Sequence, residues 1–85
     1  MTIEVSDDVG RFIVEVLDER GRQDSQWGGK AHDDLHSHKE WFRFINRYTA
    51  GYGGDFETRM RKIAALTLAA YESNRRKHDN SAARN

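Results

Sequence analysis

A dense run of polar residues between positions 19 and 38 is the part of this 85-residue chain best suited to chemistry. Within twenty residues it carries three His, three Asp, two Arg, a Trp and a Gly-Gly pair. A protein that only had to fold would not need this set, so we expect a ligand to bind here. The residues predicted to bind it are Glu19, Arg20, Arg22, Gln23, Trp27, Gly28, His32, Asp33, Asp34 and His36.

The run favours recognition of a nucleotide or another phosphate-bearing small molecule. Arg20 and Arg22 offer planar donors to phosphate oxygens, and Gln23 offers an amide to a base edge. Trp27 offers a face for stacking, a role compatible with the packing at the end of the core that we predict for it. Gly28 would let backbone amides approach a phosphate without a side chain in the way.

Acidic and imidazole side chains in the same region could hold a metal. Glu15 and Glu19 are four residues apart on one predicted helix, and two carboxylates at this spacing can bind Mg²⁺ together with waters and substrate phosphates. Beside Arg22, the same spacing is also typical of a solvated helix face. His32 and His36 have the spacing of a helical zinc site, but we expect them in a loop, where hydrogen bonds across the loop are favoured over metal binding.

Composition limits the class of protein. Eighty-five residues, 36% of them hydrophobic, allow one domain with a thin core, so we expect association into a homo-oligomer. The chain has no Cys, which excludes thiolate metal sites, disulfides and thiol catalysis. Because it has no apolar run of membrane-spanning length and no leader pattern, we expect a cytoplasmic protein without a membrane partner.

Charge is distributed unevenly, although the formal net charge is +0. Residues 1–40 carry ten Asp or Glu against five Lys or Arg, and residues 41–85 carry four against nine. The basic half could meet the phosphates of a nucleic acid, through Arg75, Arg76 and Lys77. The near-neutral isoelectric point favours instead a mutual complementarity of the two halves.

Three amphipathic helices must position these residues, so the predicted fold class is all-α. The helices are predicted over residues 7–24, 38–52 and 56–78. Ser6 is the expected N-cap of the first, Ser37 and Glu40 form a capping box for the second, and Asp55 caps the third. The segment 25–36 is expected to be an ordered loop, because it carries Trp, His and Asp rather than Ser and Gly repeats.

One helical domain is expected over residues 1–78, followed by a disordered tail over 79–85 that has almost nothing to bury. Apolar residues at helical spacing predict the buried faces of the helices. The first helix presents Val9, Phe12, Ile13, Val16 and Leu17. The second presents Trp41, Phe44, Ile45 and Tyr48, with Phe42 and Tyr52 left over. The third presents Phe56, Met60, Ile63, Ala64, Thr67, Ala70 and Tyr71, and its alanines place it at the centre of the bundle and of any dimer.

Two segments resemble known proteins. One is the run Glu19-Arg20-x-Arg22-Gln23-Asp24-x-x-Trp27-Gly28, followed by His32-Asp33-Asp34, and the other is Arg59–Tyr71. The run that begins at Glu19 resembles the opening of short phage and prophage proteins. It is also similar to the N-terminal part of MazG-like, all-α nucleoside triphosphate pyrophosphohydrolases. The segment Arg59–Tyr71 resembles the closing helix of the same small proteins.

The resemblance implies an α-helical, often oligomeric protein in the cytoplasm of a bacterial host. In enzymatic members it implies cleavage between the α- and β-phosphates of a nucleotide, with Mg²⁺ held by two pairs of acids on adjacent helices. Glu15 with Asp18 or Glu19 could serve as the first pair, but Glu40, Glu57 and Glu72 have no acid three or four residues away. Two hypotheses stay open: a nucleotide-binding protein, which is a degenerate MazG-like enzyme if it turns over its ligand, or a non-enzymatic module that binds a host protein or nucleic acid.

Overall fold

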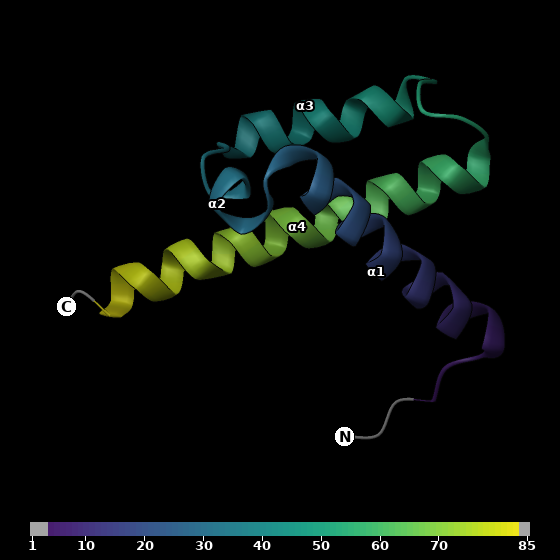
Figure 1. Cartoon of the computed structure of the whole chain (residues 1–85), viewed down its shortest axis with the longest axis horizontal. Helices are drawn as coiled ribbons and strands as arrows, with labels where there is room; N and C mark the ends of the chain where they lie inside the picture. The colour runs from purple at the N-terminus through teal and green to yellow at the C-terminus, as the bar shows by residue number, and fades with distance from the viewer. Residues whose placement is uncertain (1–3, 84–85) are drawn as a thin grey trace.

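Four helices make up the part of the chain that the computed structural model describes, which is the backbone of residues 4–83 and the side chains of residues 4–79. They are α1 Asp7–Trp27, α2 Gly29–Asp33, α3 His38–Thr49 and α4 Phe56–Ala83 (Figure 1). Residues 4–83 contain no strand, which confirms the all-α fold class. Within the same residues, no helix combines the length and apolar character needed to cross a membrane.

The predicted helix starts are confirmed by their caps. Ser6 Oγ accepts a hydrogen bond from an amide of the first turn of α1 at 3.2 Å. At the start of α3, Glu40 N donates to Ser37 Oγ at 3.2 Å and Ser37 N donates to Glu40 Oε1 at 3.0 Å. Asp55 Oδ1 accepts from an amide of the first turn of α4 at 2.9 Å. Each cap satisfies an amide that has no partner inside its helix.

The segment 25–36, predicted as a loop, is mostly helical. α1 continues to Trp27, where Gly28, at φ 100°, ends it by donating its N–H to Asp24 O at 3.0 Å. Glycine adopts this left-handed conformation readily, which makes it a common helix stop. The short helix α2 follows at once, so the predicted loop is reduced to the Gly28 turn and the residues between α2 and α3.

α3 ends at Thr49 rather than at the predicted position 52 because Gly51 takes a left-handed conformation, at φ 115°, and Tyr52 N donates to Arg47 O at 3.3 Å. Arg59 of α4 bonds to the last turn of the helix. Its Nε donates to Tyr48 O at 2.7 Å and its Nη2 donates to Thr49 O at 3.2 Å. These bonds satisfy two carbonyls of the last turn of α3 and tie that turn to α4.

α4 extends five residues beyond the end predicted at position 78, to Ala83. The segment 79–85, predicted as a disordered tail, therefore overlaps the helix at residues 79–83. The last two residues, 84–85, lie outside the described residues.

α4 is the central helix, as its alanines predict, because it packs against each of the other three helices. α3 runs antiparallel beside it, and α1 crosses it so that the N-terminal half of α1 projects away from the other helices (Figure 1). The core lies between α3 and α4, where Trp41, Leu66 and Ala69 form a buried cluster. Phe44, Ile45, Tyr48 and Ala70 pack around that cluster, which confirms the predicted stripe of α3.

The buried face predicted for α1 is largely wrong, and the face predicted for α4 is confirmed in part, because Met60, Ile63, Ala64 and Ala70 are half-buried. In the α1 stripe only Val16 is buried, and the polar residues Glu19, Arg20 and Gln23 are buried in place of its apolar neighbours. On α4 the predicted Phe56 and Tyr71 are exposed. The buried residues of α4 are Ala65, Leu66, Ala69 and Ser73. The first two turns of α1 contribute no buried residue, because this end of the helix projects away from the other helices.

Candidate functional site

A cavity of about 220 Å³ lies where the C-terminal half of α1 meets α2, α3 and α4. Six of the ten residues predicted to bind a ligand line it: Arg20, Gln23, Trp27, His32, Asp33 and His36. The structure therefore brings most of the polar run to one place. Trp27 lies at this cavity with 42% of its surface exposed, rather than plugging the end of the core.

Aromatic rings form much of the remaining wall. Trp41, Phe44 and Tyr48 come from successive turns of α3 and so share one face of that helix. The His36 ring lies edge to face against the rings of His32, Trp41 and Phe44, with centroids 4.8, 5.1 and 4.8 Å away. The sequence predicts the α3 residues as core alone, because a stripe that packs a core and one that lines a cavity have the same spacing.

Gln23 brings an amide donor to this wall. Its side chain is almost completely buried, and Nε2 has no hydrogen-bond partner among the described residues. A buried amide donor left unpaired costs about 1–3 kcal/mol. Gln23 lines the cavity, but Nε2 itself has essentially no accessible surface, so a ligand acceptor would meet it only after a rotation of the amide.

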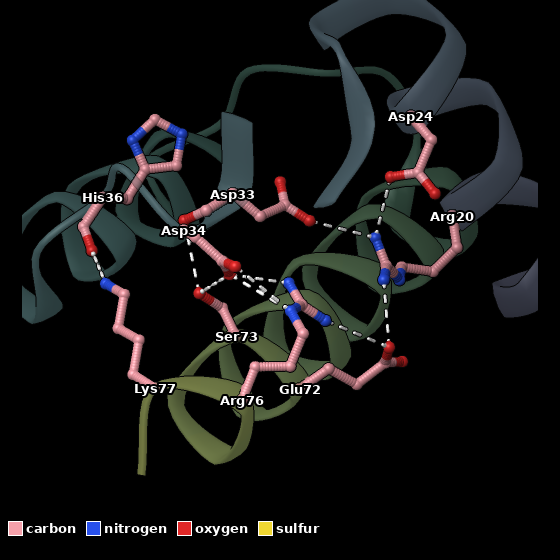
Figure 2. Close-up of polar contacts among 9 residues, drawn as sticks. All are labelled: Arg20, Asp24, Asp33, Asp34, His36, Glu72, Ser73, Arg76 and Lys77. Atoms are coloured by element: carbon pink, nitrogen blue, oxygen red, sulfur yellow. Dashed lines mark hydrogen bonds and ion pairs between the residues drawn. The ribbon is translucent and has the colours of Figure 1, made fainter. Parts of the chain in front are cut away.

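Arg20 holds the polar end of the cavity together, as Figure 2 shows. Its Nη1 lies 3.0 Å from Asp24 Oδ1 and 3.4 Å from Asp33 Oδ2, and its Nη2 donates to Glu72 Oε2 at 3.3 Å. One buried cation thus faces three carboxylates and joins α1, α2 and α4. Because these acids outnumber it, Arg20 is poorly suited to the phosphate-binding role expected from the sequence.

Burial raises the pKa of the Asp33 carboxyl, and this effect outweighs the opposing effect of the Arg20 guanidinium. The charged form of Asp33 is therefore disfavoured in the fold. Additional negative charge beside Asp33, such as that of a phosphate, would be disfavoured by the same burial.

Asp34, which does not line the cavity, fixes the end of α2 to α4 (Figure 2). Its Oδ1 accepts from Arg76 Nη2 and from Ser73 Oγ, both at 2.8 Å. The hydrogen bond from Arg76, followed by that from Ser73, holds the pKa of Asp34 below its usual value. Lys77 Nζ adds a bond to His36 O at 2.9 Å. Asp34 therefore anchors the segment that carries the cavity-lining histidines.

Gly28 shapes the site because it has no side chain. Its φ is 100°, and a Cβ built on it would lie 3.3 Å from His32 Cβ. The glycine thus allows the turn from α1 into α2 and the close approach of His32, a cavity-lining side chain.

Three further predicted residues, Glu15, Glu19 and Arg22, are not among the cavity-lining residues. Glu19 Oε1 accepts from Arg22 Nη2 at 3.2 Å, and Glu15 Oε2 lies 3.5 Å from Arg61 Nη1. Within the described residues, no group of three or more His, Asp or Glu is placed to hold a metal ion. The two acids expected to bind Mg²⁺ each have an arginine partner instead.

Arg47 is a candidate that the sequence analysis missed. It lines the cavity from α3 and is exposed, so it lies at the rim. Among the described residues no carboxylate forms an ion pair with it, unlike Arg20. Its position three residues after Phe44, on the same helix face, is the signal that could have found it.

The cavity therefore combines aromatic walls with polar residues, three of which differ in how they are paired within the described part of the chain. They are Gln23, whose amide donor is unpaired, Arg20, which is paired with acids, and Arg47 at the rim, which has no acidic partner.

Comparison of the chain with protein-family models, with curated proteins and with solved structures finds no match.

Proposed function

We propose that the protein binds a nucleotide-type small molecule, with a planar heterocyclic ring inside the cavity and a phosphate outside, at Arg47. The observation that carries the proposal is the cavity itself, which has aromatic walls and is lined by Gln23, whose buried Nε2 has no partner among the described residues. Aromatic side chains stack on the face of any base, and an amide donor recognises an acceptor on a base edge.

The size of the cavity favours a ring, rather than a whole nucleotide, inside it. Pockets that enclose drug-sized ligands measure about 300–1,000 Å³. A cavity of about 220 Å³ is smaller than that range. It suits a single ring system, so the sugar and the phosphate of the ligand would remain outside.

The charges favour the same orientation. Asp24, Asp33 and Glu72 surround the guanidinium of Arg20 and would repel a phosphate at that end. Arg47, at the rim, can offer its planar donors to phosphate oxygens. A nucleotide that places its base inward would keep its phosphate away from these acids and close to Arg47.

The proposal is binding without turnover. In the MazG-like enzymes that the sequence resembles, paired acids hold Mg²⁺ beside the phosphates. Glu15 and Glu19 are instead paired with Arg61 and Arg22, away from the cavity lining.

Thermal unfolding and calorimetric titration with nucleosides and nucleoside monophosphates, with and without Mg²⁺, test the proposal. A ligand present at 100 times its Kd stabilises the folded state by about 2.7 kcal/mol. We expect the best monophosphate to raise the Tm equally with and without Mg²⁺ and to be recovered unchanged.

Variants test the orientation of the ligand. Gln23→Leu removes the amide at nearly constant volume and should weaken nucleoside and nucleotide binding alike. Arg47→Ala should weaken nucleotide binding by roughly tenfold, about 1.4 kcal/mol, and leave nucleoside binding unchanged. Arg43→Ala, on the same helix but outside the cavity lining, is the matched control.

Two outcomes would contradict the proposal. If millimolar nucleotides neither shift the Tm nor perturb the indole NMR signals of Trp27 and Trp41, the cavity does not bind this class of ligand. If Arg47→Ala weakens nucleoside and nucleotide binding equally, the phosphate does not lie at Arg47.

A further inference from the structure

One side of α1 carries an apolar stripe that no other described part of the chain covers. Ile13, Val14 and Leu17 are 47%, 59% and 55% exposed. Gly10 and Gly21 extend the stripe at its two ends. Positions 10, 13, 14, 17 and 21 follow the spacing of a single helix face, to one side of the face that lines the cavity.

The two glycines have no role within the described chain. Neither Gly10 nor Gly21 has a positive φ, and a Cβ built on either would meet nothing within 4 Å. A glycine inside a helix is about 1 kcal/mol less favourable than alanine. Gly21 is exposed and Gly10 is half-buried, and the small size of both would let the backbone of a second helix approach closely.

The chain also exposes more surface than a compact monomer of its mass. Its accessible surface is 6526 Å². A typical folded monomer of 9.9 kDa exposes about 5,200 Å². The accessible surface of the chain includes the terminal residues outside the described ranges, so only part of the difference of about 1,300 Å² belongs to the packed helices, and a standard interface needs roughly 800 Å² from each partner. The projecting N-terminal half of α1 contributes to this difference (Figure 1).

We propose that a second copy of the chain covers this stripe, with the two α1 helices antiparallel across a two-fold axis. Positions 10, 14, 17 and 21 are separated by four, three and four residues, a spacing that is the same in both directions. An antiparallel pair therefore places Val14 against Leu17 of the partner subunit and Gly10 against Gly21 of the partner subunit. Such a contact is self-complementary, as a two-fold interface requires.

The interface differs from the one expected from the sequence. The alanines of α4 were the expected centre of a dimer, but Ala65 and Ala69 are buried within the chain. The proposal is independent of any ligand, because the stripe does not include the residues that line the cavity.

Sedimentation velocity of the full chain over a range of concentrations tests the interface. We expect wild-type protein to reach twice the chain mass of 9.9 kDa. Leu17→Glu should remain monomeric and folded, because Leu17 is exposed within the chain. Phe42→Glu alters another exposed apolar helix residue, on α3, and should dimerise like the wild type.

Gly21→Ala separates an interface role from a folding role. Alanine favours the helix, so the variant should have a higher Tm than the wild type when both are monomeric. It should also raise the dimer dissociation constant by on the order of tenfold. A wild-type chain that stays monomeric at millimolar concentration, or a dimer that survives both Leu17→Glu and Gly21→Ala, would overturn the proposal.

Discussion

Arg20 Nη1 and Asp33 Oδ2 lie 3.4 Å apart and connect α1 to α2 across the Gly28 turn. The Arg20 side chain is only 10% exposed and the Asp33 side chain only 14%. Because Asp24 and Glu72 share the same guanidinium, a single residue neutralises charges that belong to three helices. The geometry of the cavity therefore depends on Arg20 even if no ligand atom touches it.

Replacing Arg20 with Met should strongly destabilise the protein. The variant keeps the apolar stem but leaves Asp24 and Asp33 without the cation they share, while Glu72 keeps its ion pair with Arg76 at 3.9 Å. Removing one partner of a buried ion pair costs about 3–5 kcal/mol, and we expect the lower end here because Asp24 and Glu72 are more exposed than Asp33. Urea unfolding at neutral pH measures the change.

Arg75→Met is the matched control. Arg75 contacts Asp79, both side chains are mostly exposed, at 55% and 70%, and exposed ion pairs contribute about 0–1 kcal/mol. Equal losses of stability in the two variants would show that the cluster around Arg20 has no special role.

The neighbouring aspartates should respond to pH in opposite directions. The pKa of Asp34 is lowered, chiefly by Arg76, so its stabilising effect is present above the ordinary value of 3.8 and is lost as the pH falls through the lower folded value. The pKa of Asp33 is raised, chiefly by burial, so the free energy of unfolding falls as the pH rises through that raised value.

The variants Asp34→Asn and Asp33→Asn separate these effects. At neutral pH, Asp34→Asn should lower the free energy of unfolding by about 1 kcal/mol, a modest loss because the pair with Arg76 is partly exposed. Asp33→Asn should leave it unchanged or raise it. Each difference should shrink as the pH falls through the folded pKa of the carboxyl concerned. If both variants lower the free energy of unfolding at neutral pH, the assignment is wrong.

Local signals made much of the fold predictable. The caps at Ser6, Ser37 and Asp55 act on amides within their own first turns, so each helix start can be found without knowledge of the other helices. The density of polar residues near position 20 also located half of the residues that line the cavity. The chemistry of the cavity was harder to predict, because the partners of Arg20 include Glu72, fifty-two residues away.

The wrong predictions concern segments whose structure depends on contacts with residues distant in the sequence. α2 has five residues and a glycine as N-cap without a side-chain bond, so its local signal is weak. Its end is fixed through Asp34 to Ser73 and Arg76 of α4. On α4 itself several faces are partly apolar, and periodicity cannot tell which one meets another helix.

Ser73→Ala should destabilise the anchor between α2 and α4. Only 1% of Ser73 is exposed, and its hydroxyl donates to Asp34 Oδ1 at 2.8 Å. Losing this bond, while the aspartate keeps Arg76, should lower the free energy of unfolding by about 1–2 kcal/mol. Ser25→Ala, at an exposed position of α1, should change it by less than about 0.5 kcal/mol. Thermal unfolding of the two variants decides whether the buried hydroxyl matters.

Alanine at the two adjacent glycines should separate backbone strain from the positioning of His32. Both Gly28 and Gly29 have positive φ, at 100° and 71°, so either substitution should cost about 1–2 kcal/mol of stability. A Cβ at Gly29 meets nothing within 4 Å, whereas one at Gly28 lies 3.3 Å from His32 Cβ. Gly28→Ala should therefore be the more destabilising variant, and it alone should shift the NMR signals of the His32 and His36 rings. If Gly29→Ala perturbs these rings equally, the close approach at Gly28 does not position them.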